Sequence, residues 1–538
     1  MSPDQSVGRA LENRAVLPRW RSPGESVDEM LGVGSEKNKQ PDRGWIKRLL
    51  RDFNDAPTAA TAAELRESAF ALGEQLPADV LMRMEGFSRG ALHPNSNTPS
   101  FDQGVHDKGI AIRALRKKIS LEPRQPFAWS ELARNQLANG DSDGAVASMA
   151  CATQLAPTNR YILRSAVRLL SHVPADLDGD RVSWLLKRSG SLTRDPWLLS
   201  AEIAASTAAD KTSDFIGRAK KMLMDNKFHP RHLAELAAAV GTVEHQYGRH
   251  KKAKENFAQS MIDPNENAVA QALYVAQDDK KIVVPSDVLA RPGSFETHAR
   301  LAYTSGAWAD VAQQCRLWLS DEPFDTRPAV LGSYLSFEPA LVQQAQVLAT
   351  MGLRCSPQDY LLLNNRAVAY AYSGLVAEAY SDIRSAVRIH RSHPHIMATL
   401  GLIACRAGYV EYGLALYEQT IAWFAYLKDR DSLIRAVLYW LREAVRAGTT
   451  EGSAELSRVR AWISRLPQRD QESEIRGLIE AVEREQGMAR LGDDLSYSGP
   501  LTVNDFEELK MRIDAPQESF SYDKSIPDSE LLSRDFGG

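Results

Sequence analysis

Three histidines close together in one segment are the residues of this chain whose type and spacing could bind a transition metal. His390, His393 and His395 lie within the stretch IHRSHPHIM. Pro394 interrupts the group, and no Cys, Asp or Glu adjoins it to complete a ligand set. The histidine pair in KFHPRHL (227–233) is likewise interrupted by a proline, and no Cys, Asp or Glu adjoins it. We therefore interpret both groups as polar turn residues and expect neither a metal nor another cofactor.

The motifs of common enzymes do not occur in this sequence. It has no Gly-rich loop followed by Lys-Ser/Thr, no GxGxxG, no GxSxG elbow and no HExxH. The four cysteines (Cys151, Cys315, Cys355 and Cys405) include no CxxC pair, which argues against a disulfide framework and a Cys-rich zinc site. This cysteine usage fits a reducing cytoplasm. We predict a protein without catalytic residues, and an enzyme with an unrecognised site is the least favoured hypothesis.

Basic residues outnumber acidic ones between positions 211 and 254. A basic stripe on a helical array could follow a phosphate backbone, but few aromatic residues lie nearby to stack on bases. We therefore favour contact with a protein and keep nucleic-acid binding as the alternative function. The candidate basic patch consists of Arg218, Lys220, Lys221, Arg249, Lys251, Lys252 and Lys254.

The composition is that of an ordinary soluble protein. Of the 538 residues, 43% are hydrophobic and 25% are charged, and the net charge is only −4. So small a charge gives no whole-chain argument for nucleic acid or for an anionic membrane. No apolar run approaches the roughly 20 residues of a spanning helix, and no secretory h-region is visible near the start. We expect a cytoplasmic protein with no membrane contact.

The elements that must position these residues follow an internal repeat. From Pro292 onward the chain falls on a 34-residue grid. Gly306, Gly374 and Gly408 share one position of the grid, where glycine permits a tight turn between two helices. Pro323 and Pro357 share a later position, where proline ends the second helix. Small residues at further shared positions predict that the two helices of each pair cross closely.

An earlier block, 126–159, carries five residues of a known repeat pattern: Trp129, Leu132, Ala145, Ala152 and Pro157. The chain resembles the tetratricopeptide repeat family, and we expect a bacterial-type member. The resemblance implies an all-α fold, a solenoid of helix-turn-helix repeats in a right-handed superhelix. It also implies a non-enzymatic scaffold or adaptor, because a curved stack of helices offers a long concave surface to a peptide or protein.

In this family, certain positions of the first helix of each repeat face the concave side. Arg and Tyr are enriched at such positions here, and both are common in binding hot spots. The resemblance implies one or more protein partners; an enzyme that the chain regulates is one candidate, and a second copy of the chain is another. The predicted concave-face residues are Arg134, Arg300, Tyr303, Arg327, Tyr334, Asn364, Asn365, Tyr372, His395 and Arg406.

The two ends differ in composition from the middle of the chain. The first segment contains prolines, glycines and mixed charge with little periodic apolar content, and the last is acidic with interleaved aromatic residues. We predict a flexible N-terminal segment at 1–43, helices and a loop at 44–108, partly degenerate repeats at 109–291 and in-register repeats at 292–487. The acidic tail at 488–538 is either an interaction tail or a solvated flexible tail.

Overall fold

The structure, a computed structural model, describes residues 15–21, 101–173, 179–225, 227–290, 294–448, 473–489 and 501–516, with a few positions between 50 and 84 and position 499. Within these residues the chain forms helices and no strands. The helices divide into two compact units, residues 13–297 and residues 298–538, which we call the N-terminal and C-terminal units. None of the described helices is both long and apolar enough to cross a membrane.

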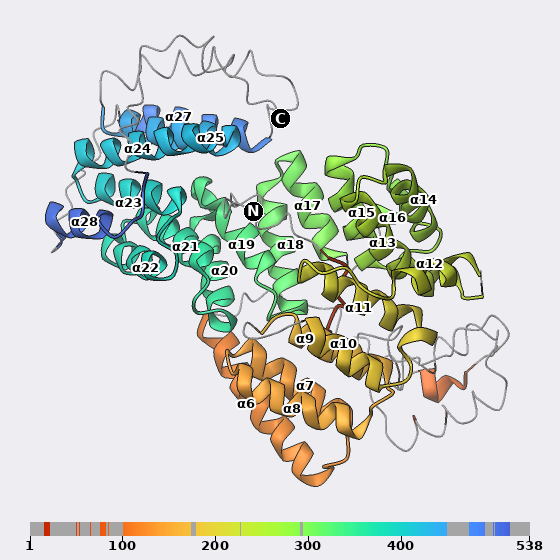
Figure 1. Ribbon diagram of the computed structural model, residues 1–538. Helices are drawn as coiled ribbons and strands as arrows, with labels where there is room; N and C mark the ends of the chain where they lie inside the picture. Colours follow the sequence, from red (N-terminus) through yellow and green to blue (C-terminus); the bar gives the residue numbers. More distant parts are fainter. Residues whose placement is uncertain are drawn as a thin grey trace. The chain divides into compact units, whose positions relative to one another are not determined.

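The N-terminal unit is built from helices that pack against their neighbours in sequence (Figure 1). Its apolar core runs along α9 to α15. The helices are α6 (Phe101–Leu121), α7 (Pro126–Ala138), α8 (Ser142–Leu155), α9 (Arg160–Leu170), α10 (Gly179–Arg188), α11 (Pro196–Ala208), α12 (Ile216–Met224), α13 (Pro230–Gln246), α14 (His250–Ser260), α15 (Glu266–Asp278) and α16 (Ser286–Leu289), with a 3-10 turn at Leu192–Arg194 and the start of α17 (Phe295–Ser305).

The C-terminal unit repeats the same plan, and one continuous apolar core links its helices. After the rest of α17 it contains α18 (Trp308–Asp321), α19 (Arg327–Tyr334), 3-10 turns at Leu335–Phe337 and Pro339–Leu341, α20 (Val342–Cys355), α21 (Tyr360–Tyr372), α22 (Val376–Ile389), α23 (Pro394–Arg406), α24 (Val410–Leu427), α25 (Arg430–Arg446), α27 (Ser473–Ala489) and α28 (Val503–Lys510). The predicted fold class, an all-α array of helix-turn-helix repeats, is confirmed.

The sequence signals for helix ends lie where the helices begin and end. Asp195 caps α11 by accepting a hydrogen bond from the Trp197 amide at 2.9 Å, and Pro196 occupies the first helical position. Helices α18 and α20 both end two residues before a grid proline, at Asp321 and Cys355. Proline therefore separates successive pairs, as predicted.

Glycines make the tight turns and the close crossing of the pair α23 and α24. Gly408 joins the two helices with φ of 92°, a left-handed conformation that favours glycine. A Cβ atom on Gly413 would lie 2.6 Å from the carbonyl oxygen of Gly401, closer than real Cβ contacts. Only glycine therefore fits at this crossing, which confirms the close approach that the repeat predicted.

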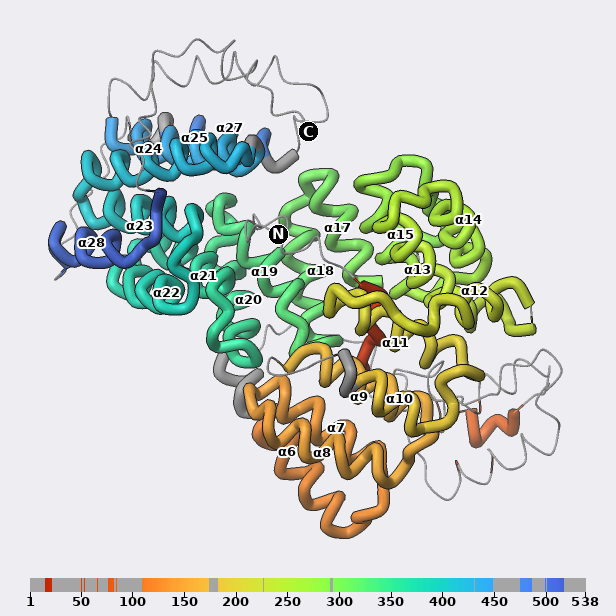
Figure 2. The backbone as a smooth tube through the Cα atoms, in the orientation of Figure 1, coloured from red at the N-terminus to blue at the C-terminus, as the bar shows by residue number. Residues whose placement is uncertain are grey.

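Residues 15–21, which we call the strap, differ from the expectation of a flexible N-terminal segment. They form neither helix nor strand, lie within the N-terminal unit and bury Val16, Pro18, Arg19 and Trp20 (dark red in Figure 2). Val16 joins the apolar core formed by α9 to α15. The few apolar residues of this segment pack against the helices, while the rest of 1–43 lies outside the described residues.

Part of the predicted acidic tail is also ordered, since residues 501–516 pack on the C-terminal unit. Phe506 of α28 is fully buried, and its ring lies 5.5 Å from that of Tyr380 and 6.0 Å from that of Tyr409. The hydroxyl groups of these tyrosines donate hydrogen bonds to the carbonyl oxygens of Asp505 (2.8 Å) and Leu501 (3.0 Å). An aromatic residue of the tail thus holds α28 on the repeats.

Candidate peptide-binding site

Two helix side chains hold the backbone of the strap. Tyr161, in the first turn of α9, donates a hydrogen bond from its hydroxyl to the carbonyl oxygen of Arg21 at 2.7 Å. Asn267, in the first turn of α15, donates from Nδ2 to the carbonyl oxygen of Leu17 at 2.8 Å. Because every residue carries a backbone carbonyl, these two contacts hold the backbone of the segment without selecting a particular side chain.

Two carboxylates face the arginines of the strap. Nη1 of Arg21 lies 3.2 Å from Oε1 of Glu266 on α15, and Nη2 of Arg19 lies 3.4 Å from Oε2 of Glu296 on α17. Glu296 is fully buried, and its ion pair with Arg19 offsets part of the cost of burying its charge. The surface therefore complements a segment that contains arginine.

Trp20 supplies the largest apolar contact of the strap. Its exposed fraction is 0%, and it is among the largest fully buried side chains of the described residues. A buried tryptophan flanked by charged pairs is the usual composition of a binding hot spot. The strap thus occupies its surface in the manner of a bound peptide, through backbone contacts, ion pairs of Arg19 and Arg21 with Glu266 and Glu296, and one aromatic side chain.

A buried ion pair beneath the strap positions Asn267. Nη1 of Arg164 lies 2.8 Å from Oε2 of Glu235, and the two side chains are only 0% and 2% exposed. Oε1 of Glu235 accepts hydrogen bonds from Nδ2 of Asn265 (2.8 Å) and of Asn267 (3.3 Å). The guanidinium of Arg164 lies 4.9 Å from the centre of the Trp197 ring. This network joins α9, α11, α13 and α15 and fixes the amide that contacts the strap.

The ten predicted concave-face residues are divided between the two units. Arg134 alone belongs to the N-terminal unit, where it pairs with Glu131 of the same helix at 2.9 Å. The other nine belong to the C-terminal unit, so the structure does not bring the ten together in one described site. The strap site contains none of them.

Three of the nine are buried among the helices. Arg300, Asn364 and Asn365 are 9%, 6% and 3% exposed. Asn365 donates hydrogen bonds to the carbonyl oxygen of Val330 (3.3 Å) and to Oγ of Ser333 (3.1 Å), which ties α21 to α19. These side chains have little surface left for a partner.

Two others meet in a buried charge network at the ends of α21 and α23. The guanidinium of Arg442 lies 4.1 Å from the centre of the Tyr372 ring, and that of Arg406 lies 5.0 Å from it. Arg406 pairs with Glu443 at 2.7 Å and Arg442 with Glu485 at 3.0 Å, so two positive charges balance two negative ones. Burial raises the pKa of Tyr372 to about 12, which keeps the phenol neutral. The sequence indicated Tyr372 and Arg406 but missed their three partners.

The remaining residues of the set are half-buried and have neighbours within the C-terminal unit. Tyr303 and Tyr334 pack against other aromatic rings at centroid distances of 5.6 and 6.0 Å. Arg327 pairs with Asp325 at 2.6 Å. Their role in partner binding remains a prediction.

His395 at the start of α23 gives the C-terminal unit a pH dependence. Burial, with help from the positive charges of His393 and Arg435, holds the pKa of His395 well below its usual value. The unfolded chain therefore binds a proton at this residue below about pH 6.5 that the folded chain does not bind. The free energy of unfolding is therefore highest above that pH. It falls as the pH drops, by up to about 1.4 kcal/mol per pH unit.

We expect the free energy of unfolding to decrease between pH 7 and pH 5. Urea unfolding, monitored by hydrogen exchange in α23, would measure this decrease. His395→Gln should flatten the dependence, whereas His229→Asn, at an exposed site, should not. An equal slope in the wild type and His395→Gln would contradict the assignment.

The predicted basic patch is partly neutralised. Lys220 and Arg249 both pair with Glu244, the latter at 3.5 Å. Burial alone would raise the pKa of Glu244, but the two cations hold it below its usual value. Nε of Arg218 donates to the carbonyl oxygen of Thr193 at 3.0 Å. The exposed lysines of the patch are Lys221, Lys251, Lys252 and Lys254.

Sequence reasoning missed the strap site because it searched for helical periodicity. The strap reads AVLPRWR, and its contacts are with residues far away in the sequence, such as Tyr161 and Asn267. The available signal was a lone tryptophan between two arginines in a segment otherwise rich in polar residues. That pattern is common in peptides that bind to other proteins.

No protein family model matches this chain, and no curated protein matches it. Among solved structures, the chain is similar to yeast Tom70, at 11% identity over 84% of this chain and 97% of that chain, with a TM-score of 0.28. A tetratricopeptide repeat protein from Parabacteroides merdae shows 14% identity over 54% and 90%, with a TM-score of 0.22. The structure of Naa15/Naa10 bound to HypK-THB shows 13% identity over 85% and 77%, with a TM-score of 0.21. Scores this low carry no argument about function.

Proposed function

We propose that this chain is a non-enzymatic scaffold that binds an arginine-containing segment of a partner protein on the surface that the strap covers. The observation that carries the proposal is the mode of strap binding. Tyr161 and Asn267 contact backbone carbonyls, while Glu266 and Glu296 meet arginines. A partner segment with the same backbone and charge would make the same contacts after the strap leaves.

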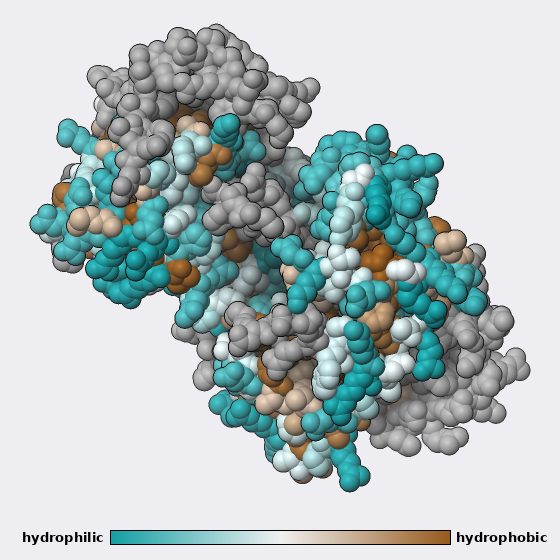
Figure 3. Space-filling model, in the orientation of Figure 1, coloured by the Kyte–Doolittle hydropathy of each residue, from teal (hydrophilic) through white to brown (hydrophobic). Residues whose placement is uncertain are grey.

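The surroundings of the site suit this role. The visible face of the structure is mainly hydrophilic, with scattered apolar residues (Figure 3). Large exposed apolar side chains of the described residues include Trp184 and Met224. Recognition would then depend on a few buried contacts and not on a broad apolar patch. All four cysteines are free thiols, which is compatible with work in a reducing cytoplasm.

Nucleic-acid binding through the basic patch has less support. Glu244 neutralises two of its cations, and the carbonyl of Thr193 holds a third in place. A phosphate-binding patch would need those charges free to release counterions. The remaining exposed lysines are better suited to an acidic protein surface.

The test is a binding titration between a labelled peptide of residues 13–23 and a chain lacking residues 1–22. We expect saturable binding, because the peptide restores the contacts of the strap. Trp20→Ala in the peptide should weaken it by roughly 30-fold or more, the loss typical of a hot-spot residue. Asn267→Ala in the chain should also weaken it, because one backbone contact is lost.

The matched control is Asn256→Ala. Asn256 is a half-buried asparagine of α14 whose side-chain amide donates to the carbonyl oxygen of Lys252 within its own helix, so this variant should bind the peptide normally. Circular dichroism would verify that each variant keeps its helices. No binding to a folded truncated chain, or equal binding of the Trp20→Ala peptide, would contradict the proposal.

A further inference from the structure

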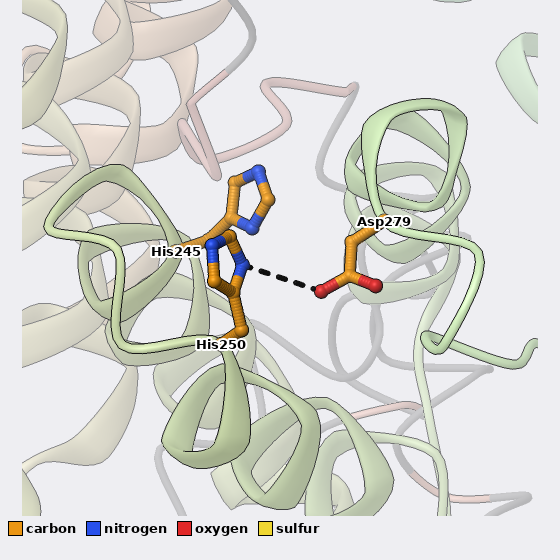
Figure 4. A group of neighbouring side chains, drawn as sticks. All are labelled: His245, His250 and Asp279. Atoms are coloured by element: carbon orange, nitrogen blue, oxygen red, sulfur yellow. Dashed lines mark ion pairs between the residues drawn. The ribbon is translucent and has the colours of Figure 1, made fainter.

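Three metal-ligating side chains converge in the N-terminal unit at a place that the sequence did not indicate. His245 lies in the last turn of α13, His250 is the first residue of α14, and Asp279 caps the C-terminus of α15. Each offers one ligand atom, and these atoms all lie within 4.8 Å of one another. Figure 4 shows both imidazole rings and the carboxylate gathered between the three helices.

The distances approach those of a tetrahedral ion. With bonds of about 2.0–2.1 Å, tetrahedral ligand atoms lie roughly 3.4 Å apart. Nδ1 of His250 is already 3.4 Å from Oδ2 of Asp279, and the centroids of the His245 and His250 rings are 5.2 Å apart. The three ligand atoms lie within 4.8 Å of one another, so binding of an ion would require the side chains to move closer together.

The backbone around the cluster holds these residues in position. The amide of Gly248 donates to the carbonyl oxygen of His245 at 2.8 Å, closing the turn that places the two histidines side by side. The amide of Lys281 donates to Oδ1 of Asp279 at 3.0 Å, which leaves Oδ2 directed at His250. Such outer contacts orient ligands in known metal sites.

The unsatisfied ring of His245 is a second, independent observation. Its Nδ1 is buried and has no hydrogen-bond partner among the described residues. A buried imidazole nitrogen without a partner is costly, and coordination is one way to satisfy such a ring. A simple ion pair between His250 and Asp279 would explain the 3.4 Å distance but would leave His245 unexplained.

The ligand types select the class of metal. Two imidazoles and one carboxylate suit zinc and similar transition metals, whereas Ca²⁺ and Mg²⁺ require mainly oxygen ligands. Exposed lysines on α14 (Lys251 and Lys252) also disfavour ions that are held by charge alone. Three protein ligands leave the fourth position of a tetrahedral ion open.

We propose that His245, His250 and Asp279 form a binding site for Zn²⁺ or a similar transition-metal ion, with one coordination position open to water or to a ligand from a partner. The ion links the end of α13, the start of α14 and the end of α15. It therefore clamps the turn of one helix pair to the next helix and stabilises the folded N-terminal unit. This site is separate from the strap surface and does not depend on the proposed function.

The test is titration of the untagged full-length chain with ZnCl₂, measured by isothermal calorimetry and by competition with a chromophoric chelator. We expect one ion bound per chain, and a rise in the midpoint of thermal unfolding when zinc is added. Co²⁺ in place of Zn²⁺ should give the visible absorption of a low-coordinate site.

His245→Ala, His250→Ala and Asp279→Asn should each weaken zinc binding at least about tenfold, since even loss of an outer contact typically costs 10–100-fold. His229→Asn is the matched control, because His229 is exposed and lies 3.8 Å from Asp263 without joining a three-ligand group. Circular dichroism would show that the variants are folded. No zinc binding by the wild type, or binding that survives all three substitutions, would overturn the proposal.

Discussion

Replacement of Glu235 by leucine is expected to lower the free energy of unfolding of the N-terminal unit by about 3–5 kcal/mol. The change leaves the guanidinium of Arg164, which is 0% exposed, without its carboxylate partner. It also removes the acceptor that positions Asn267, so the strap should loosen. Because the chain has two units, hydrogen exchange in α9 and α13 is a better measure than one unfolding curve.

Two control variants separate the buried charge from other effects of the substitution. Arg164→Met combined with Glu235→Leu removes both charges and should recover much of the lost stability. Glu131→Ala breaks the pair with Arg134, whose side chains are 18% and 13% exposed, and should cost less than Glu235→Leu because the remaining arginine keeps some contact with water. If the double variant is as unstable as Glu235→Leu, the unpaired charge is not the cause.

The second large effect is expected from Phe506→Ala. A fully buried phenylalanine contributes about 3–5 kcal/mol relative to alanine, and here that energy holds α28 on the repeats. A helix of 8 residues is not stable in water by itself. Amide protection across Val503–Lys510 should therefore fall by about 100-fold or more, while α24 and α25 keep theirs.

Hydrogen exchange measured by mass spectrometry would follow this loss directly. Met511→Ala is the matched control in the same segment, because Met511 is 76% exposed and its truncation should change protection little. Unchanged protection of α28 in Phe506→Ala would show that the aromatic contact does not hold the helix in place.

The repeat architecture was predictable because it depends on local rules. Gly408 and Gly413 occupy positions where a turn and a close crossing accept only glycine, and Pro323 and Pro357 follow the ends of helices. Such residues repeat at a fixed spacing, so their meaning can be inferred from the sequence alone.

The candidate sites were less predictable because they depend on pairs that are distant in sequence. Tyr161 contacts a residue 140 positions away, and Asn267 contacts one 250 positions away. His245, His250 and Asp279 meet only because α13, α14 and α15 stack. The histidines that drew attention in the sequence, His390 and His393, lie in a cluster of rings with Tyr360, in edge-on and tilted contacts.

The strap also determines how strongly an outside partner must bind. Its contacts to Tyr161, Asn267, Glu266 and Glu296 are already made within the chain, so a partner segment has to replace them one for one. If the strap occupies its surface about 99% of the time, the apparent dissociation constant of any competitor rises roughly 100-fold. Segments that are scarce or bind weakly would then not displace the strap. Only an abundant or multivalent partner would bind to the surface that the strap covers.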